Sequence, residues 1–408
     1  MPGGILKLYQ EHWFPFANLP AALAEFTRST SIKTELVWDQ VGIGTIERMF
    51  DQMIGSFTKP NPVYDLICTD EIILQEMARK GLVEDLSARM VRDALTLDNV
   101  SDATRHAVTY GSAIVGLPCV NVSSMVMYRA DLLEKYCLPV PSDWAELKEV
   151  AASLQNAARR DGRAEFYGFE TRGAAGGGHS VFTFGSFIGS FGARWLTPDG
   201  EVEAISDGHR QAMAIYVDLL RTVAPPDQGD ISFVEMRRDM ASGRVGMIMD
   251  VGMEYAHAIK NVPEVGDKVG IALVPAGPAG RAPNLYAPPW AIPANSDMKE
   301  EAWELCKYLT SDRQLLEDGL MANAIETASL PALYSPEFDR HFREDILAVT
   351  RACRAIQKQE RPFSAMGVDA CTVVGDAVNA ALVGKLSEED ALQSIYAGLA
   401  TLRRRNRR

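Results

Sequence analysis

The stretch ILKLYQEHWFPFANLPAALAEFTRSTSIKTELV, residues 5–37, decides the fold class of this chain. It begins with an apolar segment of strand type at residues 5–9 and ends with another at residues 32–37. Between the two, apolar residues recur at helical spacing, and Pro20 suits a first helical turn. These apolar residues are Leu19, Ala22, Leu23 and Phe26. A strand, a helix and a strand in this order predict parallel strand pairing, and therefore an α/β protein.

The alternation of strands and helices continues along the chain. Residues 64–68 form a third apolar segment of strand type, and residues 245–249 and 269–274 form later ones. Helical spacing of apolar residues recurs between them, for example over residues 212–223. After about residue 335 the strand signals disappear. The sequence therefore predicts an α/β architecture that ends in a helical C-terminal segment.

Composition and charge limit the functional classes. The chain has 408 residues, of which 47% are hydrophobic and 23% charged, and this favours a globular protein of two or three folding units. Its 41 Lys and Arg stand against 54 Asp and Glu, for a formal net charge of −13. Such a negative body disfavours a nucleic-acid partner, and we expect the basic residues 403–408 to be a solvated end.

The N-terminus and the cysteines leave the compartment open. Residues 1–16 contain no basic leader followed by an apolar stretch, so the protein either stays in the cytoplasm or belongs to a longer chain whose leader is removed. No apolar run approaches the roughly 18 residues of a membrane-spanning helix, so we expect a soluble protein. The six cysteines are scattered without metal-ligand spacing, which predicts small core residues, and no metal or cofactor is expected.

Templates for catalysis find no support in the chain. No Gly-x-Ser-x-Gly turn stands between a strand and a helix, and no two histidines are spaced as zinc ligands on one helix. The glycine-rich segment 173–178 has the backbone freedom to cradle a phosphate, but no Lys-Ser or Lys-Thr follows it. We therefore expect this segment to be a loop that wraps a ligand, rather than a phosphate-binding loop.

Several segments resemble a known family, in the same order and over nearly the whole chain. The clearest are Tyr64-Asp65-Leu66-Ile67, Gly81-Leu82-Val83, Gly116-Leu117-Pro118, Met127-Tyr128-Arg129-Ala130-Asp131-Leu132, Asp143-Trp144-Ala145-Glu146-Leu147, Gly243-Arg244-Val245-Gly246-Met247 and Trp290-Ala291-Ile292-Pro293. Each motif is weak alone. In order and spacing they resemble the carbohydrate-type solute-binding proteins of bacterial ABC transporters, extracellular solute-binding family 1, which is related to maltose-binding protein.

The resemblance implies a particular fold. It is the type II periplasmic-binding-protein fold, in which two α/β lobes enclose an interlobe ligand cleft and close over the ligand by a hinge motion. By resemblance, residues 1–117 and 253–325 form the N-terminal lobe. Residues 118–252 and 326–408 form the C-terminal lobe.

Eight residues are candidate ligand contacts, because they lie after strands or in loops where open α/β sheets bind ligands. They are His12, Trp13, Gln40, Asp70, Asn121, Arg172, Asp250 and Trp290. A sugar or polyol needs polar side chains for its hydroxyl groups and aromatic faces for its C–H groups, which these residue types supply.

Six of these candidates also have a purely structural interpretation. Both indoles could be core residues, His12 a hydrogen-bonded structural imidazole and Asp70 the N-cap of a helix. Asn121 could form a turn, and Arg172 could lie on the surface. The sequence does not decide between the two interpretations.

The resemblance implies the substrate-binding component of an ABC importer, not an enzyme. We expect its ligand to be a neutral sugar or polyol, because the candidate set contains few cationic side chains. Its expected partners are the membrane permease subunits of the transporter. We expect a monomer that acts in the periplasm or outside the cell. The alternatives are a carbohydrate-active enzyme, a polysaccharide lyase or hydrolase, that uses the same cleft, and a cytoplasmic scaffold with a large exposed apolar patch.

Overall fold

The computed structural model describes residues 4–39, 46–57, 63–197, 200–252, 262, 264–362 and 366–406. The chain forms two compact units. Unit 1 consists of Met1–Val122 and Tyr286–Arg343, and unit 2 consists of Ser123–Leu285 and Glu344–Arg408. We treat each unit separately.

The chain passes between the units at places that differ from those expected. The first passage follows Val122, close to the expected position after residue 117, whereas the second follows Leu285 instead of residue 252. The reason lies in strand β10 (Val269–Leu273), which pairs antiparallel with β7 (Val122–Arg129) of the unit 2 sheet. These hydrogen bonds keep the segment before Leu285 in unit 2. The third passage follows Arg343 instead of residue 325.

Unit 1 contains a five-stranded sheet in the order β2-β1-β3-β12-β6. Its strands are β1 (Ile5–Glu11), β2 (Lys33–Asp39), β3 (Leu66–Cys68), β6 (Leu117–Pro118) and β12 (Pro289–Ala291). Strand β1 runs parallel to both β2 and β3, which confirms the parallel pairing predicted from residues 5–37. Strand β12 lies antiparallel between β3 and β6. A two-stranded sheet of β4 (Thr109–Tyr110) and β5 (Ala113–Ile114) accompanies it.

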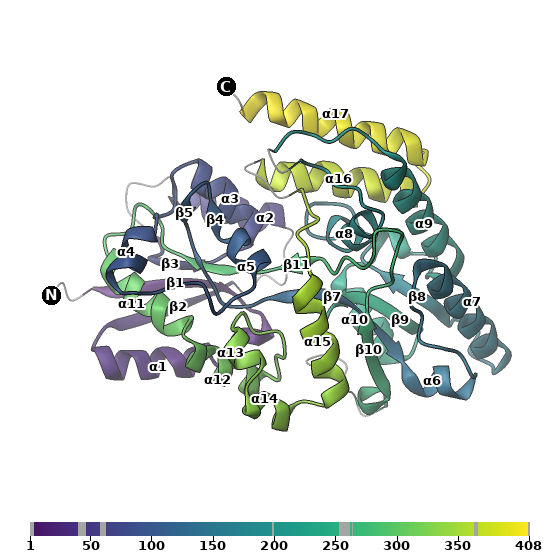
Figure 1. Ribbon diagram of the computed structural model, residues 1–408, viewed down its shortest axis with the longest axis horizontal. Coiled ribbons are helices and arrows are strands. Elements are labelled where there is room, and N and C mark those ends of the chain that lie inside the picture. Colours follow the sequence, from purple (N-terminus) through teal and green to yellow (C-terminus); the bar gives the residue numbers. More distant parts are fainter. Residues whose placement is uncertain are drawn as a thin grey trace. The chain divides into compact units, whose positions relative to one another are not determined.

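Helices cover both faces of the unit 1 sheet. Helix α1 (Leu19–Thr30) packs through its predicted apolar residues, all of which are buried. Its C-cap is Ser31, which adopts the left-handed conformation. Figure 1 shows α1 on one side of the sheet, with α2 (Ile46–Phe57) and α3 (Glu71–Arg79) on the other. The remaining helices are η1 (Phe14–Phe16), α4 (Ser87–Arg92), α5 (Asp102–Ala107), α11 (Lys299–Leu309), α12 (Asp312–Ala322), α13 (Leu330–Leu333) and α14 (Pro336–His341).

Unit 2 contains a mixed sheet in the order β10-β7-β9-β8, with β11 (Leu285–Tyr286) paired to β7 beside this path. Strand β9 (Val245–Val251) is buried at every residue, as expected for a central strand. It runs parallel to β8 (Tyr167–Thr171) and antiparallel to β7. The carboxyl ends of β8 and β9 therefore meet at the same edge.

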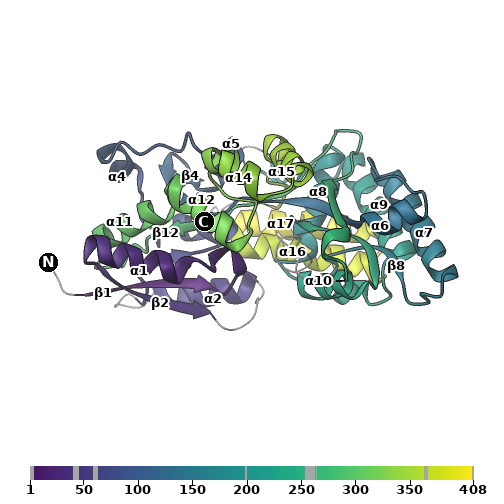
Figure 2. The same ribbon diagram turned by 90° about the horizontal axis from the view of Figure 1, so that it is seen from below.

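The helices of unit 2 include the C-terminal segment. Helices α16 (Gly367–Leu382) and α17 (Glu388–Asn406) lie side by side, in yellow in Figures 1 and 2. No strand is assigned in the described residues after β12, which agrees with the predicted helical end of the chain. The other helices are α6 (Ala130–Lys135), α7 (Trp144–Arg160), α8 (Ser180–Ser190), α9 (Asp207–Val223), η2 (Gln228–Asp230), α10 (Phe233–Ser242), η4 (Gly266–Lys268) and α15 (Glu344–Ile356).

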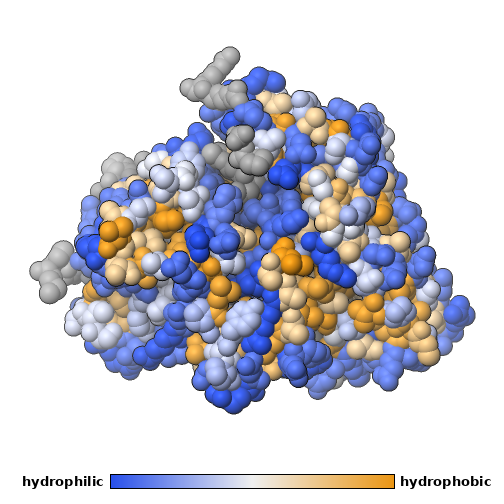
Figure 3. Space-filling view, viewed as in Figure 1, coloured by the Kyte–Doolittle hydropathy of each residue, from blue (hydrophilic) through white to orange (hydrophobic). Residues whose placement is uncertain are grey.

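The prediction that the cysteines are core residues is confirmed for all but Cys137. Five of the six cysteines are buried and only Cys137 is exposed. Among the described residues, no helix combines the length and the apolar character that crossing a bilayer requires. On the face shown in Figure 3, hydrophobic residues are interspersed with hydrophilic ones. That face does not offer the large apolar patch expected of a scaffold.

Candidate functional site

The parallel strands of unit 1 gather several predicted residues at one edge of the sheet. Strand β1 ends at Glu11 and is followed by His12 and Trp13. Strand β3 ends at Cys68, and Asp70 follows it. Because β1 and β3 are parallel neighbours, their carboxyl ends meet at this edge, which is where open α/β sheets bind ligands.

Aromatic rings line this edge. The His12 ring is exposed and lies 5.1 Å from the Trp38 ring at the end of β2. The Trp13 ring lies 5.9 Å from the Tyr286 ring and 6.2 Å from that of Phe16. Trp13 is half-buried, so these contacts orient its indole while part of it stays accessible. An indole held in this way suits the apolar face of a sugar or polyol.

Carboxylates lie beside the rings, at the start of helix α3. Asp70 is the N-cap of the helix: its Oδ1 accepts a hydrogen bond from the backbone N–H of Ile72 at 2.6 Å. The N-cap that the structural interpretation of Asp70 predicts is therefore present. Glu71, completely buried, accepts a hydrogen bond at its Oε2 from the backbone N–H of Ala287 at 3.2 Å. This bond ties the carboxylate to the segment that carries Tyr286.

The Tyr286 hydroxyl keeps its proton at neutral pH. Burial raises the pKa of Tyr286 well above its usual value, and the nearby charges of Asp70, Glu71 and Glu11 raise it further. A protonated phenol can donate a hydrogen bond, whereas the carboxylates accept them. The edge of unit 1 thus combines donors, acceptors and aromatic faces.

Two other predicted residues of unit 1, Trp290 and Asn121, do not join this group. Trp290 is only 1% exposed and packs against the Phe16 ring, centroid to centroid 5.9 Å, in the central strand β12. This geometry favours a core indole over a ligand platform. Asn121 is completely buried and donates a hydrogen bond from its Nδ2 to the Thr104 hydroxyl, as a structural amide does. Gln40 lies outside the described residues.

In unit 2, Arg172 and Asp250 form a buried ion pair. Asp250 lies inside β9, which runs to Val251, and not after the strand as expected. Arg172 follows β8, and the parallel pairing of β8 and β9 brings the two side chains together. The Arg172 Nη2 and Nε donate to the Asp250 Oδ1 at 2.6 and 3.0 Å, and the Arg172 Nη1 donates to the Gly178 carbonyl at 3.1 Å. The guanidinium fork that we expected to face a ligand is therefore occupied by Asp250.

Two aromatic rings hold the guanidinium in place. Its central carbon lies 4.9 Å from the ring of Phe182 and 5.1 Å from that of Phe233. The Arg172 side chain is 12% exposed and that of Asp250 is completely buried. A buried pair with this geometry positions the glycine-rich segment 173–178 that follows Arg172, because the Gly178 carbonyl is one of its acceptors.

The sequence analysis missed three residues of the unit 1 edge. Trp38 ends a strand, and its aromatic side chain there was a signal that could have been used. Tyr286 lies in the proline-rich segment 275–293, whose aromatic residues were available for the same reason. Glu71 carries no local signal, because its role depends on the distant Ala287.

Comparison with known proteins identifies the class. Residues 16–315 match the model of a family described as bacterial extracellular solute-binding protein. The match covers well over half of the chain, so the chain belongs to this family. Its members are transport binding proteins, not enzymes.

One curated relative supports the assignment over part of the chain. A probable ABC transporter-binding protein of Deinococcus radiodurans is 28% identical over 209 residues, which are 50% of this chain and 49% of that protein. The chain therefore matches about half the length of this relative.

Solved structures match over almost the full length. The maltose-bound MalE3 of T. maritima is 25% identical, with a TM-score of 0.85, and the match covers 98% of this chain and 99% of that one. A solute-binding protein of Agrobacterium radiobacter K84, in complex with ribitol, is 23% identical with a TM-score of 0.85 over 98% and 99% of the two chains. One of Agrobacterium vitis S4, with bound D-mannitol, is 21% identical with a TM-score of 0.79 over 98% of each. These likenesses confirm the expected fold class, and the match over residues 16–315 confirms the expected family.

Proposed function

We propose that this protein is the substrate-binding component of an ABC importer, and that it captures a neutral sugar or polyol between its two units by hinge closure. The observation that carries the proposal is the family match over residues 16–315. In this class of protein, ligand and closed state stabilise each other because the ligand contacts both units.

The residues of unit 1 support an uncharged, hydroxyl-bearing ligand. The accessible part of Trp13 supplies an aromatic face, and the Tyr286 hydroxyl and the Asp70 carboxylate lie at the same edge. Hydroxyl groups both donate and accept hydrogen bonds, so they fit a mixture of phenol and carboxylate. In unit 2, Asp250 and the Gly178 carbonyl occupy Nε, Nη2 and Nη1 of Arg172, which disfavours an anionic ligand at this residue.

The ligands of the structural relatives point to the same class. Ribitol, D-mannitol, α-D-tagatose and maltose are named as the bound molecules of four of them. All four are neutral and rich in hydroxyl groups. We propose this class for the present chain as well, with action in the periplasm or outside the cell, as a monomer that delivers its ligand to the permease subunits.

Isothermal titration calorimetry tests the ligand class. Ribitol, D-mannitol, D-tagatose and maltose are titrated into the protein, with a mixture of amino acids as the comparison. We expect stoichiometric binding of at least one sugar or polyol. Heat from the amino acids, with none from any sugar or polyol, would reject the proposal.

A substitution tests the part played by the unit 1 edge. Trp13→Ala removes the aromatic face and should weaken binding of the preferred ligand by about 1–3 kcal/mol. The matched control is Tyr396→Ala, which removes an aromatic side chain that is 39% exposed on α17 and should leave the affinity unchanged. Equal affinities of the Trp13 variant and the wild type would exclude this edge as the binding surface.

Mass analysis of the ligand after incubation tests whether it is released unchanged. We expect the same mass before and after binding, because a binding protein of this family captures its ligand without chemical conversion. A product of different mass that appears with turnover would replace the proposal with the enzyme alternative.

A further inference from the structure

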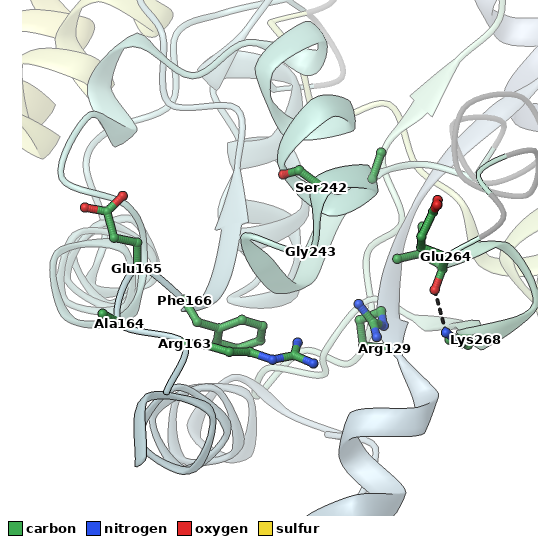
Figure 4. Close-up of a pocket in the computed structure, with 11 residues that line it drawn as sticks. Arg129, Arg163, Ala164, Glu165, Phe166, Ser242, Gly243, Glu264 and Lys268 are labelled. Carbon is green, nitrogen blue, oxygen red and sulfur yellow. Dashed lines mark hydrogen bonds between the residues drawn. The ribbon is translucent and has the colours of Figure 1, made fainter. Parts of the chain in front are cut away.

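A hollow on unit 2, shown in Figure 4, lies away from the residues considered so far. Its volume is about 720 Å³, and its lining includes Arg129, Arg163, Phe166, Gly243 and Lys268. Phe166 and Gly243 come just before strands β8 and β9. The hollow therefore lies at the amino ends of these parallel strands, at the opposite end of the sheet from the Arg172 and Asp250 pair.

Arg129 presents a buried cation to this hollow. Arg129 is 5% exposed, and its Nε and Nη2 each donate to a carboxylate oxygen of Asp131 at 2.7 Å. Among the described residues, its Nη1 has no hydrogen-bond acceptor and lies against Gly243, 3.5 Å from where a Cβ would stand. Because Gly243 has no side chain, this edge of the guanidinium stays open.

The Asp131 carboxylate holds Arg129 rather than closing the hollow. Burial alone would raise the pKa of Asp131, but its hydrogen bonds from Arg129 and the nearby charge of Lys268 lower it overall. The pair therefore stays ionised at neutral pH, with both Asp131 oxygens engaged on Nε and Nη2. The orientation of Arg129 is thus set before any ligand arrives.

Arg163 supplies a second guanidinium. It is exposed, and its central carbon lies 5.9 Å from the centre of the Phe166 ring. In Figure 4 the Arg163 side chain extends along this ring toward Arg129. An oxyanion that lies between two guanidinium groups is attracted by both.

The lining contains three cationic side chains, those of Arg129, Arg163 and Lys268, and the carboxylates of Glu165 and Glu264. Lys268 donates a hydrogen bond to the backbone carbonyl of Glu264 at 2.7 Å, which tethers it at the rim, and its charge also acts on the Asp131 carboxylate. In Figure 4 the Glu264 carboxylate points away from this bond, and Glu165 is turned away from Arg129.

We propose that this hollow binds a small organic or inorganic polyanion, with one oxyanion group held between Arg129 and Arg163. A guanidinium matches the paired oxygens of a carboxylate or phosphate, and Lys268 adds a point charge for a second group of the same ligand. The chemistry shared by di- or tricarboxylates and by phosphates therefore defines the ligand class. The site is distinct from the unit 1 edge, because its lining residues belong to unit 2, and it lies at the opposite end of the unit 2 sheet from the Arg172 and Asp250 pair.

Calorimetry at low ionic strength with citrate and with inorganic pyrophosphate tests this site, and acetate at equal ionic strength serves as the control ligand. We expect citrate or pyrophosphate to bind with a Kd below about 1 mM, and acetate to bind more weakly. Tighter binding of citrate assigns the site to carboxylates, and tighter binding of pyrophosphate assigns it to phosphates. No heat from either probe at millimolar concentration would overturn the proposal.

Variants locate the binding. Arg163→Gln removes an exposed guanidinium that makes no ion pair among the described residues, so it should fold normally and raise the Kd of the probe at least about tenfold. The matched control is Arg160→Gln, an exposed arginine of α7 outside the lining, which should leave the Kd unchanged. An equal loss of affinity for the probe in both variants, or no loss in Arg163→Gln, would contradict the proposed site. Affinity for the sugar or polyol should be the same in all three proteins.

Discussion

At the scale of single residues, the buried pair of Arg172 and Asp250 sets a large energetic constraint. Removing one partner of a buried ion pair leaves the other charge uncompensated in a poorly solvated site. Asp250→Asn keeps the shape of the side chain and removes its charge. We expect this variant to lower the free energy of unfolding by about 3 kcal/mol, measured by urea denaturation without ligand.

An exposed pair provides the control for this prediction. Asp218 pairs with Lys148, and the two side chains are 59% and 38% exposed. Asp218→Asn should therefore change the free energy of unfolding by no more than about 1 kcal/mol. Similar losses of unfolding free energy in Asp250→Asn and Asp218→Asn would show that burial of the Arg172 and Asp250 pair adds nothing to its effect on stability.

A second prediction at this scale concerns pH. Burial raises the pKa of Glu360 to about 7, while Lys358 and Arg194 act in the opposite direction. The folded protein then holds this proton more tightly than the unfolded chain, whose Glu pKa is about 4.3. The contribution of Glu360 to stability is therefore complete below about pH 4 and is lost as the pH rises toward 7.

Replacement of Glu360 by Gln removes this dependence. Between pH 5 and pH 8, the wild type should lose on the order of 2 kcal/mol more unfolding free energy than Glu360→Gln. The measurement is urea denaturation across this pH range. Glu134→Gln, at an exposed position of α6, is the control and should follow the wild type. If the unfolding free energy of the wild type changed with pH in parallel with that of Glu360→Gln, the raised pKa of Glu360 would be refuted.

At the scale of elements, helix α16 holds the glycine-rich segment. The Gly176 backbone N–H donates to the Asp376 Oδ1 at 3.0 Å, and the Asn379 Nδ2 donates to the Gly173 carbonyl at 2.9 Å. A Cβ on Gly375 would stand 2.1 Å from the Gly176 carbonyl oxygen. Gly375 is therefore required by the close approach of the two backbones, even though glycine weakens a helix.

The effect of Gly375→Ala follows from this contact. In an open helix the change would stabilise by up to about 1 kcal/mol, but here we expect a net loss of about 1–3 kcal/mol, because one backbone must move. Thermal unfolding followed by circular dichroism measures it. Ser394→Ala, at an exposed position of α17, reports helix propensity alone and should stabilise slightly. A stabilised Gly375→Ala would mean that the segment moves away without cost.

At the scale of the whole molecule, ligand binding should both stabilise and compact the protein. A ligand that binds only the folded state at 100 times its Kd adds about 2.7 kcal/mol to the free energy of unfolding. We therefore expect a higher melting temperature with the preferred sugar or polyol, and a smaller radius of gyration in small-angle X-ray scattering. A stabilised protein with an unchanged radius would support binding without hinge closure.

The success of the sequence analysis also depends on scale. Elements were predictable where one face of a segment is apolar, as in α1, whose four predicted apolar residues are all buried. Which strands pair with one another was less predictable. The strand at residues 269–274 was expected, but its pairing with β7, which places it in unit 2, depends on residues more than a hundred positions away. For the same reason Trp290 looked like a loop residue, although β12 is a central strand.

Local patterns were enough for the fold class, the parallel start of the unit 1 sheet and the family, because hydrophobic periodicity and motif order are properties of neighbouring residues. They also placed His12, Trp13 and Asp70 after their strands. Which side chains meet was decided only by long-range packing. The ion pair of Arg172 with Asp250 and the ring contact of Trp13 with Tyr286 both form between segments that are distant in the sequence. No local pattern encodes such contacts, because they form only when the sheets are assembled.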